Sequence, residues 1–249
     1  KLEGRFVRKT DDGYALRQAG HQVVRAILSG GFTEDTTFGP VDLSIRCPFC
    51  RGTVEATYND EVLFIQCTEC PGMAGGDNYY AGTITELPFP PAGLADRTPD
   101  EVARAYLAWI YSRNRSIAAE VCPECAGQMQ TRTTVCEDHD DDEAFCDHCE
   151  SRYACWTRAT CQECKYTARS PTYYGSLEHP EVRSFFYDHG VDFSPGLTWE
   201  NWPAVADVTE TVVGVDPLDL EVVFDVDGDA LAVRLDGVGQ VVEVGETEA

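Results

Sequence analysis

Twelve cysteines in a chain of 249 residues constrain this protein more than any other feature of its sequence. Ten stand in five Cys-x2-Cys pairs, and one more cysteine forms a sixth pair with a histidine. The pairs are Cys47/Cys50, Cys67/Cys70, Cys122/Cys125, Cys136/His139, Cys146/Cys149 and Cys161/Cys164. An x2 turn lets two side chains chelate one ion, so six pairs supply the ligands of three tetrahedral zinc sites. We therefore predict three Zn²⁺ cofactors, with Cys155 left over.

The first two pairs have the spacing of a zinc ribbon. The sequences CPFCRG and CTECPG lie 16 residues apart and flank two predicted strands, Thr53–Tyr58 and Glu61–Gln66, with a turn at Asn59-Asp60. Two disulfides would need an oxidising compartment, and the sequence shows no secretory leader. A thioredoxin-like redox motif would need a βαβ context, which is absent around Cys47. Structural zinc is therefore favoured here.

Four pairs lie within residues 122–164 and predict two further ions. Sequential pairing would join the 122/125 pair to 136/139, and 146/149 to 161/164. Interleaved pairing would join 122/125 to 146/149, and 136/139 to 161/164. We favour the interleaved order slightly, because it leaves 127–135 and 151–160 as strands flanking a short ribbon. His148 is an alternative ligand to His139, and we expect Cys155 to be a buried apolar residue.

These ligand sets are typical of structural zinc. Catalytic zinc keeps one position open for water, and its ligands are usually histidines or carboxylates. The chain contains neither an H-E-x-x-H motif nor the H-x-E signature of zinc deaminases. We therefore expect no catalytic residues and no enzymatic activity.

The net charge of −24 is unevenly distributed. Residues 1–30 contain six cations and three anions, a local charge of +3, so the remaining residues carry −27. Sixteen of the 19 cations are arginine, and this acidic, lysine-poor composition is typical of proteins from extreme halophiles. An acidic interaction surface is the alternative. Nucleic acid should be repelled by most of the surface, and the N-terminus is the one basic segment.

The N-terminal segment predicts a strand at Leu2–Val7, a turn at Asp11-Asp12-Gly13, a strand at Tyr14–Leu16 and a helix at Ala19–Leu28. This order, in GRFVRKTDDGYALRQAGHQVVRAI, resembles the wing and following helix of ArsR-like winged-helix regulators. The resemblance implies double-stranded DNA as partner, with Arg5, Arg8 and Lys9 at phosphates and a recognition helix before Lys1 in an N-terminally truncated chain. The alternatives are an ordinary surface hairpin and a dimerisation or packing helix.

Helix signals recur further along the chain. A proline-rich linker at 88–97 leads into a capping box at Thr98-Pro99-Asp100-Glu101, followed by an apolar stripe that we expect to pack in the core. A second helix is predicted from Pro180 to about His189. From Leu218 the sequence alternates as strands joined by Asp-Gly turns.

Taken as a whole, the chain resembles haloarchaeal winged-helix transcriptional regulators with a zinc-ribbon C-terminal region. We predict an α+β fold: a partial winged helix (wing hairpin plus helix), zinc-ribbon modules, connecting helices and a C-terminal antiparallel β segment. The predicted units are 1–31 winged helix, 40–90 zinc ribbon, 96–120 linker helix, 121–170 double zinc region and 171–249 helix with acidic β segment. No apolar segment is long enough to span a membrane.

The resemblance implies a cytoplasmic DNA-binding transcriptional regulator with structural zinc and a possible homodimer. The alternative is a zinc-ribbon module that binds protein partners without touching DNA. An assay of duplex binding separates the two functions.

Overall fold

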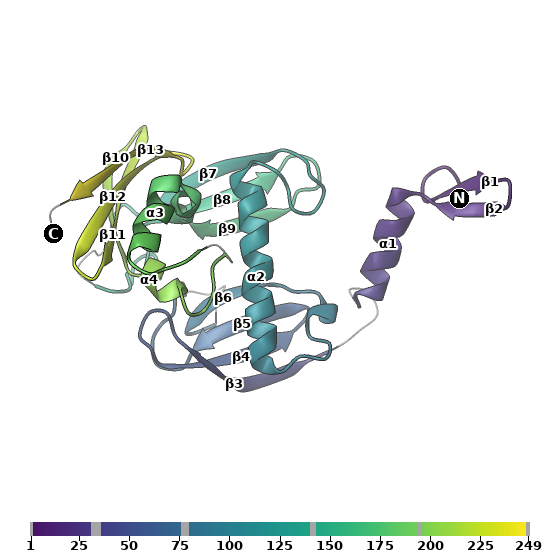
Figure 1. Cartoon of the computed structure of the whole chain (residues 1–249), viewed down its shortest axis with the longest axis horizontal. Helices are drawn as coiled ribbons and strands as arrows, with labels where there is room; N and C mark the ends of the chain where they lie inside the picture. Colours follow the sequence, from purple (N-terminus) through teal and green to yellow (C-terminus); the bar gives the residue numbers. More distant parts are fainter. Residues whose placement is uncertain (1, 31–35, 76–79, 140–142, 194–195, 248–249) are drawn as a thin grey trace.

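The computed structural model describes residues 2–30, 36–75, 80–139, 143–193 and 196–247. Four antiparallel sheets and a few helices form a mixed α and β fold, which confirms the predicted fold class at this level. Figure 1 shows the long helix α2 (Pro99–Ala118) running between two sheets, with the C-terminal sheet beside them. None of the helices in these ranges combines the length and apolar character needed to cross a membrane.

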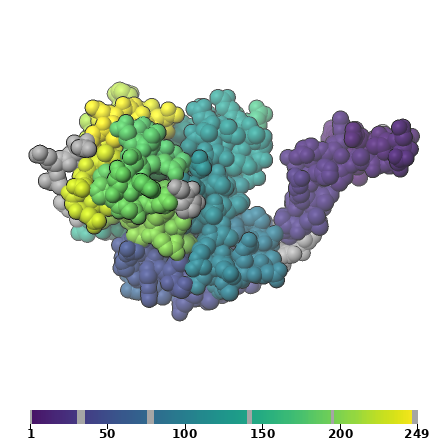
Figure 2. All heavy atoms as spheres, viewed as in Figure 1, coloured from purple at the N-terminus to yellow at the C-terminus, as the bar shows by residue number. Residues whose placement is uncertain are grey.

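The N-terminal unit is a hairpin followed by a helix. Strands β1 (Val7–Thr10) and β2 (Gly13–Leu16) pair in register, and α1 (Gln18–Leu28) follows. The predicted strand at 2–7 is wrong, because the backbone turns at Gly4 (φ +84°) and Leu2 O accepts the Phe6 N–H. Figures 1 and 2 show this unit projecting from the rest of the molecule.

The first ribbon consists of strands β3 (Phe38–Arg46), β4 (Thr53–Asn59), β5 (Val62–Cys67) and β6 (Thr83–Pro88), paired in that order. The side chains of β4 and β5 alternate between half-buried and buried, as a sheet with one covered face requires. The hairpin turn lies at Asp60-Glu61, one residue later than predicted, and both residues have positive φ. The short 3-10 turn η1 (Pro91–Gly93) then leads to α2.

Helix α2 begins with the predicted capping box. The Glu101 N–H donates to Thr98 Oγ1, and the Thr98 N–H donates to a Glu101 carboxylate oxygen. Val102, Tyr106 and Ile110 are buried, as the apolar stripe predicted. The helix therefore packs its apolar face into the core that the two neighbouring sheets share.

The second ribbon is a three-stranded sheet of β7 (Met129–Val135), β8 (Cys155–Cys161) and β9 (Thr167–Pro171). The 3-10 segment η2 (Thr172–Glu178), helix α3 (Pro180–Asp188) and the short helix α4 (Trp202–Ala206) follow. Strands β10 (Val208–Val215), β11 (Leu218–Val226), β12 (Asp229–Asp236) and β13 (Val241–Thr247) form the final meander. Sequence reasoning anticipated the last three strands and missed β10.

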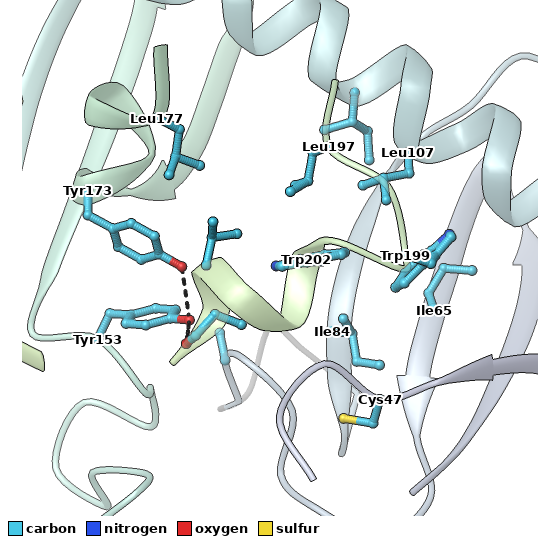
Figure 3. Close-up of a cluster of buried hydrophobic side chains, with 14 of the residues drawn as sticks. Cys47, Ile65, Ile84, Leu107, Tyr153, Tyr173, Leu177, Leu197, Trp199 and Trp202 are labelled. Carbon is cyan, nitrogen blue, oxygen red and sulfur yellow. Dashed lines mark hydrogen bonds between the residues drawn. The ribbon is translucent and has the colours of Figure 1, made fainter. Parts of the chain in front are cut away.

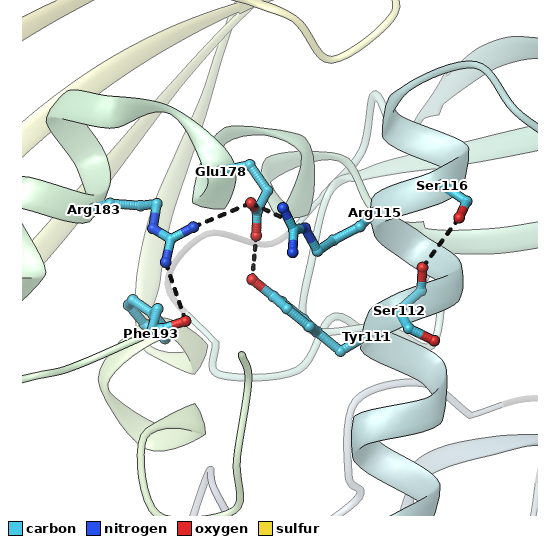
Figure 4. A network of polar contacts seen from close by, with 7 residues as sticks. All are labelled: Tyr111, Ser112, Arg115, Ser116, Glu178, Arg183 and Phe193. Atoms are coloured by element: carbon cyan, nitrogen blue, oxygen red, sulfur yellow. Dashed lines mark hydrogen bonds and ion pairs between the residues drawn. The ribbon is translucent and has the colours of Figure 1, made fainter. Parts of the chain in front are cut away.

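One hydrophobic cluster runs through the first ribbon, α2, the helical segments and the C-terminal sheet. A polar network at Glu178 adds to it (Figure 4). Glu178 accepts a hydrogen bond from Tyr111 OH and lies 3.3 Å from both Arg115 Nε and Arg183 Nη1. Burial and the Glu178 carboxylate raise the pKa of Tyr111 to about 12. These contacts join α2 to η2 and α3, and buried residues of these segments belong to the same hydrophobic cluster.

A histidine joins α3 to the turn between β11 and β12. His189 Nε2 lies 3.0 Å from Asp229 Oδ2, and this carboxylate, together with the Phe185 carbonyl, raises the pKa of His189. The contact therefore stabilises the fold fully below the unfolded pKa of about 6.5, and this contribution is lost as the pH rises through the higher folded pKa. We expect Asp229→Asn to return the pKa of His189 toward its ordinary value, as measured by NMR titration.

Asp60→Asn removes the same charge from the first ribbon and is expected to leave the titration of His189 unchanged. A His189 that titrates identically in wild type and Asp229→Asn would contradict the assignment of the shift to Asp229.

Candidate metal centres

The twelve predicted ligands lie in three groups of four. Within each group, the candidate sulfur and nitrogen atoms all lie within 4.8 Å of one another, so each group can hold one metal ion. The first group is Cys47, Cys50, Cys67 and Cys70; the second is Cys122, Cys125, Cys161 and Cys164; the third is Cys136, His139, Cys146 and Cys149.

The first group lies at one end of the first ribbon, where two tight turns meet. Cys47 Sγ is 3.7 Å from Cys70 Sγ, and Cys50 Sγ is 3.5 Å from Cys67 Sγ. A tetrahedral ion with Zn–S bonds of about 2.3 Å separates its sulfurs by about 3.8 Å, so the spacing fits. The N–H groups of Gly52 and Glu69 each donate to a ligand sulfur over 3.3 Å. These backbone bonds orient the sulfurs toward a common centre.

The second group closes the end of the second ribbon where β7 begins and β8 ends. The Cys122–Cys164 and Cys125–Cys161 sulfur pairs are 3.6 and 3.5 Å apart. The Cys164 N–H donates to Cys161 Sγ and lowers the pKa of that thiol to about 6, which favours the thiolate that a metal requires. A Cβ at Gly127 would lie 3.1 Å from Cys161 Sγ, so a residue without a side chain keeps this turn close to the sulfurs.

The third group lies at the opposite end of β7 and β8. His139 Nδ1 is 3.3 Å from Cys149 Sγ, which places His139 as the fourth candidate ligand of this group. His148 instead lies 3.8 Å from an Asp138 carboxylate oxygen and belongs to none of the three groups. Burial and the neighbouring thiols of Cys136 and Cys146 raise the pKa of Cys149 to about 12, so a bound cation must offset the cost of holding several thiolates together.

The ligand pairs of the second ribbon are nested, and both the favoured interleaved order and the sequential order are wrong. The 122/125 pair joins the 161/164 pair, and the 136/139 pair joins the 146/149 pair. The reason is the antiparallel pairing of β7 with β8, in which Met129 faces Cys161 and Val135 faces Cys155. Antiparallel pairing brings the start of β7 to the end of β8, so each end of the hairpin collects its own four ligands.

Cys155 is fully buried on β8 and lies in none of the three groups, which confirms the expectation of a buried apolar residue. Burial, the Glu210 carboxylate and Cys136 raise its pKa to about 12. The side chain is therefore a neutral thiol at physiological pH, with the low reactivity that this implies.

The loop of the third group contacts the first ribbon. Ala74 and Ser151 form an antiparallel β-bridge, and Arg152 Nε donates to Gly72 O over 2.6 Å. The Arg152 guanidinium also lies 4.4 Å from the centre of the Phe49 ring, beside the first group. The residues directly after the third group, Ser151 and Arg152, thus contact the first ribbon.

The predicted DNA-contacting side chains, Arg5, Arg8 and Lys9, are all exposed on the N-terminal unit. Arg8 and Lys9 are consecutive residues of β1 and so lie on opposite faces of the hairpin, whereas Arg5 lies in the turn before it. The structure brings them to one projecting tip without gathering them on one face. Asp227-Gly228 forms the turn between β11 and β12, as predicted for the Asp-Gly pairs of this segment.

Two family models match the chain. Residues 44–241 match a domain of unknown function (DUF7351), and residues 1–27 match a second domain of unknown function (DUF7347). The boundary between the two matches falls between the projecting N-terminal unit and the first ribbon. No curated protein and no solved structure matches the chain.

Proposed function

The chain belongs to the family of the domain of unknown function DUF7351, and from this premise we propose that it is a DNA-binding transcriptional regulator whose DUF7351 region is built on structural zinc. The observation that carries the proposal is the position of the basic charge. The local +3 of residues 1–30 belongs to the unit that projects from the body, whereas the rest of the chain carries −27. A projecting basic unit can approach a polyanion while the acidic body stays away from it.

Zinc is the proposed metal at all three groups. Two groups offer four thiolates and one offers three thiolates with an imidazole, and these are the donor sets of closed structural zinc sites. Thiolates also favour zinc over the hard cations calcium and magnesium, which prefer oxygen ligands. When bound, zinc supplies cross-links that fix the ends of both ribbons. The cysteine turns supply the N–H···S bonds that hold the ligands in place.

On the N-terminal unit, Arg5, Arg8 and Lys9 would contact backbone phosphates. Such contacts add affinity and orient the protein on a duplex, but they carry little sequence information. A hairpin that presents cations on both faces can lie against the phosphates on either side of a groove. The proposal therefore assigns the hairpin to positioning and leaves base reading to other residues.

Fluorescence anisotropy with a labelled duplex, measured over a series of salt concentrations, tests the proposal. We expect the triple variant Arg5→Ala, Arg8→Ala, Lys9→Ala to bind more weakly, because it loses phosphate contacts. Its affinity should also depend less steeply on salt, since each lost phosphate contact removes about 0.9 from the slope of log K against log salt. The matched control is Arg104→Ala, Arg132→Ala, Arg158→Ala, which removes the same charge from exposed positions on the body. This control should keep the wild-type slope.

Equal slopes in the two triple variants would show that net charge alone matters and would remove the hairpin from the proposal. A full-length protein that binds no duplex at low salt would contradict DNA binding altogether.

The second candidate function is a protein-binding module that does not touch DNA. The observation in its favour is helix α1, on which Val23, Val24, Ile27 and Leu28 are exposed apolar side chains. An apolar helix face of this kind usually packs against another surface. Absence of duplex binding, together with self-association that Ile27→Asp abolishes, would favour this function.

A further inference from the structure

A partly open cavity of about 130 Å³ lies where α2, the two ribbons and the η2–α4 segment meet. Its walls come from α2, the edge strand β6 of the first ribbon, strand β9 of the second ribbon and the segment from η2 to α4. Most of the lining is apolar and includes Ile84, Leu107, Ile110, Leu177 and Leu197. Figure 3 shows Leu177, Leu197 and Trp202 around this space. The cavity is thus built by parts of the chain that lie far apart in the sequence.

Three buried polar atoms on the cavity wall have no hydrogen-bond partner among the described residues. They are Glu86 Oε2, Tyr174 OH and Trp202 Nε1. Trp202 is only 2% exposed, so its N–H is shielded from bulk solvent. Buried polar groups in folded proteins are nearly always hydrogen-bonded, and an unpaired one costs about 1–3 kcal/mol. A bound molecule with hydrogen-bonding groups would satisfy the three atoms on this cavity wall.

The neighbouring indoles show that unpaired donors are not general in this core. Trp199 packs 5.0 Å from Trp202 and donates its N–H to Ala103 O over 3.0 Å. Trp156 donates its N–H to Ser151 Oγ over 2.8 Å. Burial raises the pKa of Tyr174, while the neighbouring Trp202 and Tyr173 side chains lower it, so these side chains lie close together without a hydrogen bond of ordinary geometry at Tyr174 OH.

Glu86 is the acceptor among the three groups. Its pKa is raised by burial, and among the described residues it forms no ion pair. The nearby cations are engaged elsewhere: Arg113 pairs with Glu124 and stacks 4.2 Å from the Trp109 ring, and Arg115 pairs with Glu178. A ligand that donates a hydrogen bond would satisfy Glu86 without adding a charge to the cavity.

We propose that this cavity is a binding site for a small, uncharged ring compound of about the size of phenol that carries one hydroxyl group. An apolar cavity of about 150 Å³ binds benzene, and this cavity of about 130 Å³ is similar in size and partly open to solvent, so it can take a single ring. In this proposal the hydroxyl oxygen accepts hydrogen bonds from Trp202 Nε1 and Tyr174 OH, and its O–H donates a hydrogen bond to Glu86 Oε2. None of these residues lies in the N-terminal unit, so the site stands independently of the proposed DNA binding.

Phenol and toluene are the probes, because they share a ring and differ by the hydroxyl group. In the zinc-loaded full chain, the ¹H–¹⁵N signals of the four tryptophan indoles can be followed during a titration. We expect phenol to bind at one site per chain and to move the Trp202 signal more than the Trp199 signal, whose N–H is already bonded. Trp202→Phe assigns the signal. Toluene should bind about fivefold more weakly than phenol, which corresponds to one lost hydrogen bond.

Two variants test the polar recognition. Tyr174→Phe and Glu86→Leu should each weaken phenol binding about fivefold and leave toluene binding unchanged, so toluene reports that the cavity is intact. Tyr187→Phe changes an exposed tyrosine on α3 and should leave both affinities unchanged. A phenol titration that moves no indole signal, or phenol binding that is equal in wild type and in both cavity variants, would overturn the proposal.

Discussion

Replacement of one cysteine in either four-cysteine group is expected to lower the zinc content from three ions per chain to two and to unfold the ribbon that loses its ion. Structural zinc in small domains contributes an apparent binding free energy of about 10–16 kcal/mol, which exceeds the stability of most domains. Cys122→Ala is the representative variant. The zinc content is measured by elemental analysis of purified protein, and unfolding by circular dichroism.

Cys155→Ala is the matched control, since it removes a buried thiol from β8 without removing a ligand. It should keep three ions per chain. A loss of zinc from this variant, or full zinc content in Cys122→Ala, would contradict the assignment of the ligands.

Double variants distinguish the nested arrangement from the others. Cys122→Ala with Cys164→Ala removes two ligands of one group and should cost one ion, whereas Cys122→Ala with Cys149→Ala should cost two. Under interleaved pairing the first combination would cost two ions and the second only one. The count of ions therefore separates the arrangements.

The second large effect is expected at Phe186, where α3 packs on the C-terminal sheet. Its side chain is fully buried, and its ring centre lies 5.2 Å from that of Phe193 and 5.3 Å from that of Phe224. Phe186→Ala should lower the free energy of unfolding by about 3–5 kcal/mol, because it removes these contacts and leaves a cavity. Denaturant unfolding at a fixed salt concentration measures the change.

Tyr187→Ala tests the neighbouring position on the same helix, where the side chain is 67% exposed. It should change the free energy of unfolding by no more than about 0.5 kcal/mol. Similar losses at the two positions would mean that helix propensity, rather than packing against the sheet, dominates the stability of α3.

The candidate metal ligands could be predicted from the sequence because chelation is a local property. An x2 turn places two side chains on one ion regardless of the rest of the fold, so Cys47 and Cys50 are recognisable as a pair without any tertiary information. The grouping of pairs is different, because it depends on which strands are neighbours. The strands predicted at 127–135 and 151–160 contained the necessary signal: pairing them antiparallel brings the 122/125 and 161/164 turns together.

The unpaired polar groups of the cavity could not be predicted in this way, because no local sequence pattern identifies them. Glu86 lies on a short edge strand, Tyr174 lies in the 3-10 segment η2, and Trp202 begins the five-residue helix α4; these elements are too short to show a clear hydrophobic period. Their convergence depends on how α2, the two ribbons and the η2–α4 segment pack around one space. The spacing of apolar residues in a sequence predicts whether a segment forms a helix or a strand. It does not show which polar atoms remain without a hydrogen bond once the helices and strands pack together.

The sequence by itself determined the twelve ligands, the capped helix α2, the C-terminal hairpins and the concentration of basic charge in residues 1–30. Each of these follows from interactions between residues that are close along the chain, namely chelation, capping, turn formation and local charge. Only the tertiary structure decided the nested metal groups, the shared core of the two ribbons and the largely apolar cavity with its unpaired polar atoms. These follow from contacts between distant segments, whose geometry is set when the apolar faces of all the elements are buried together.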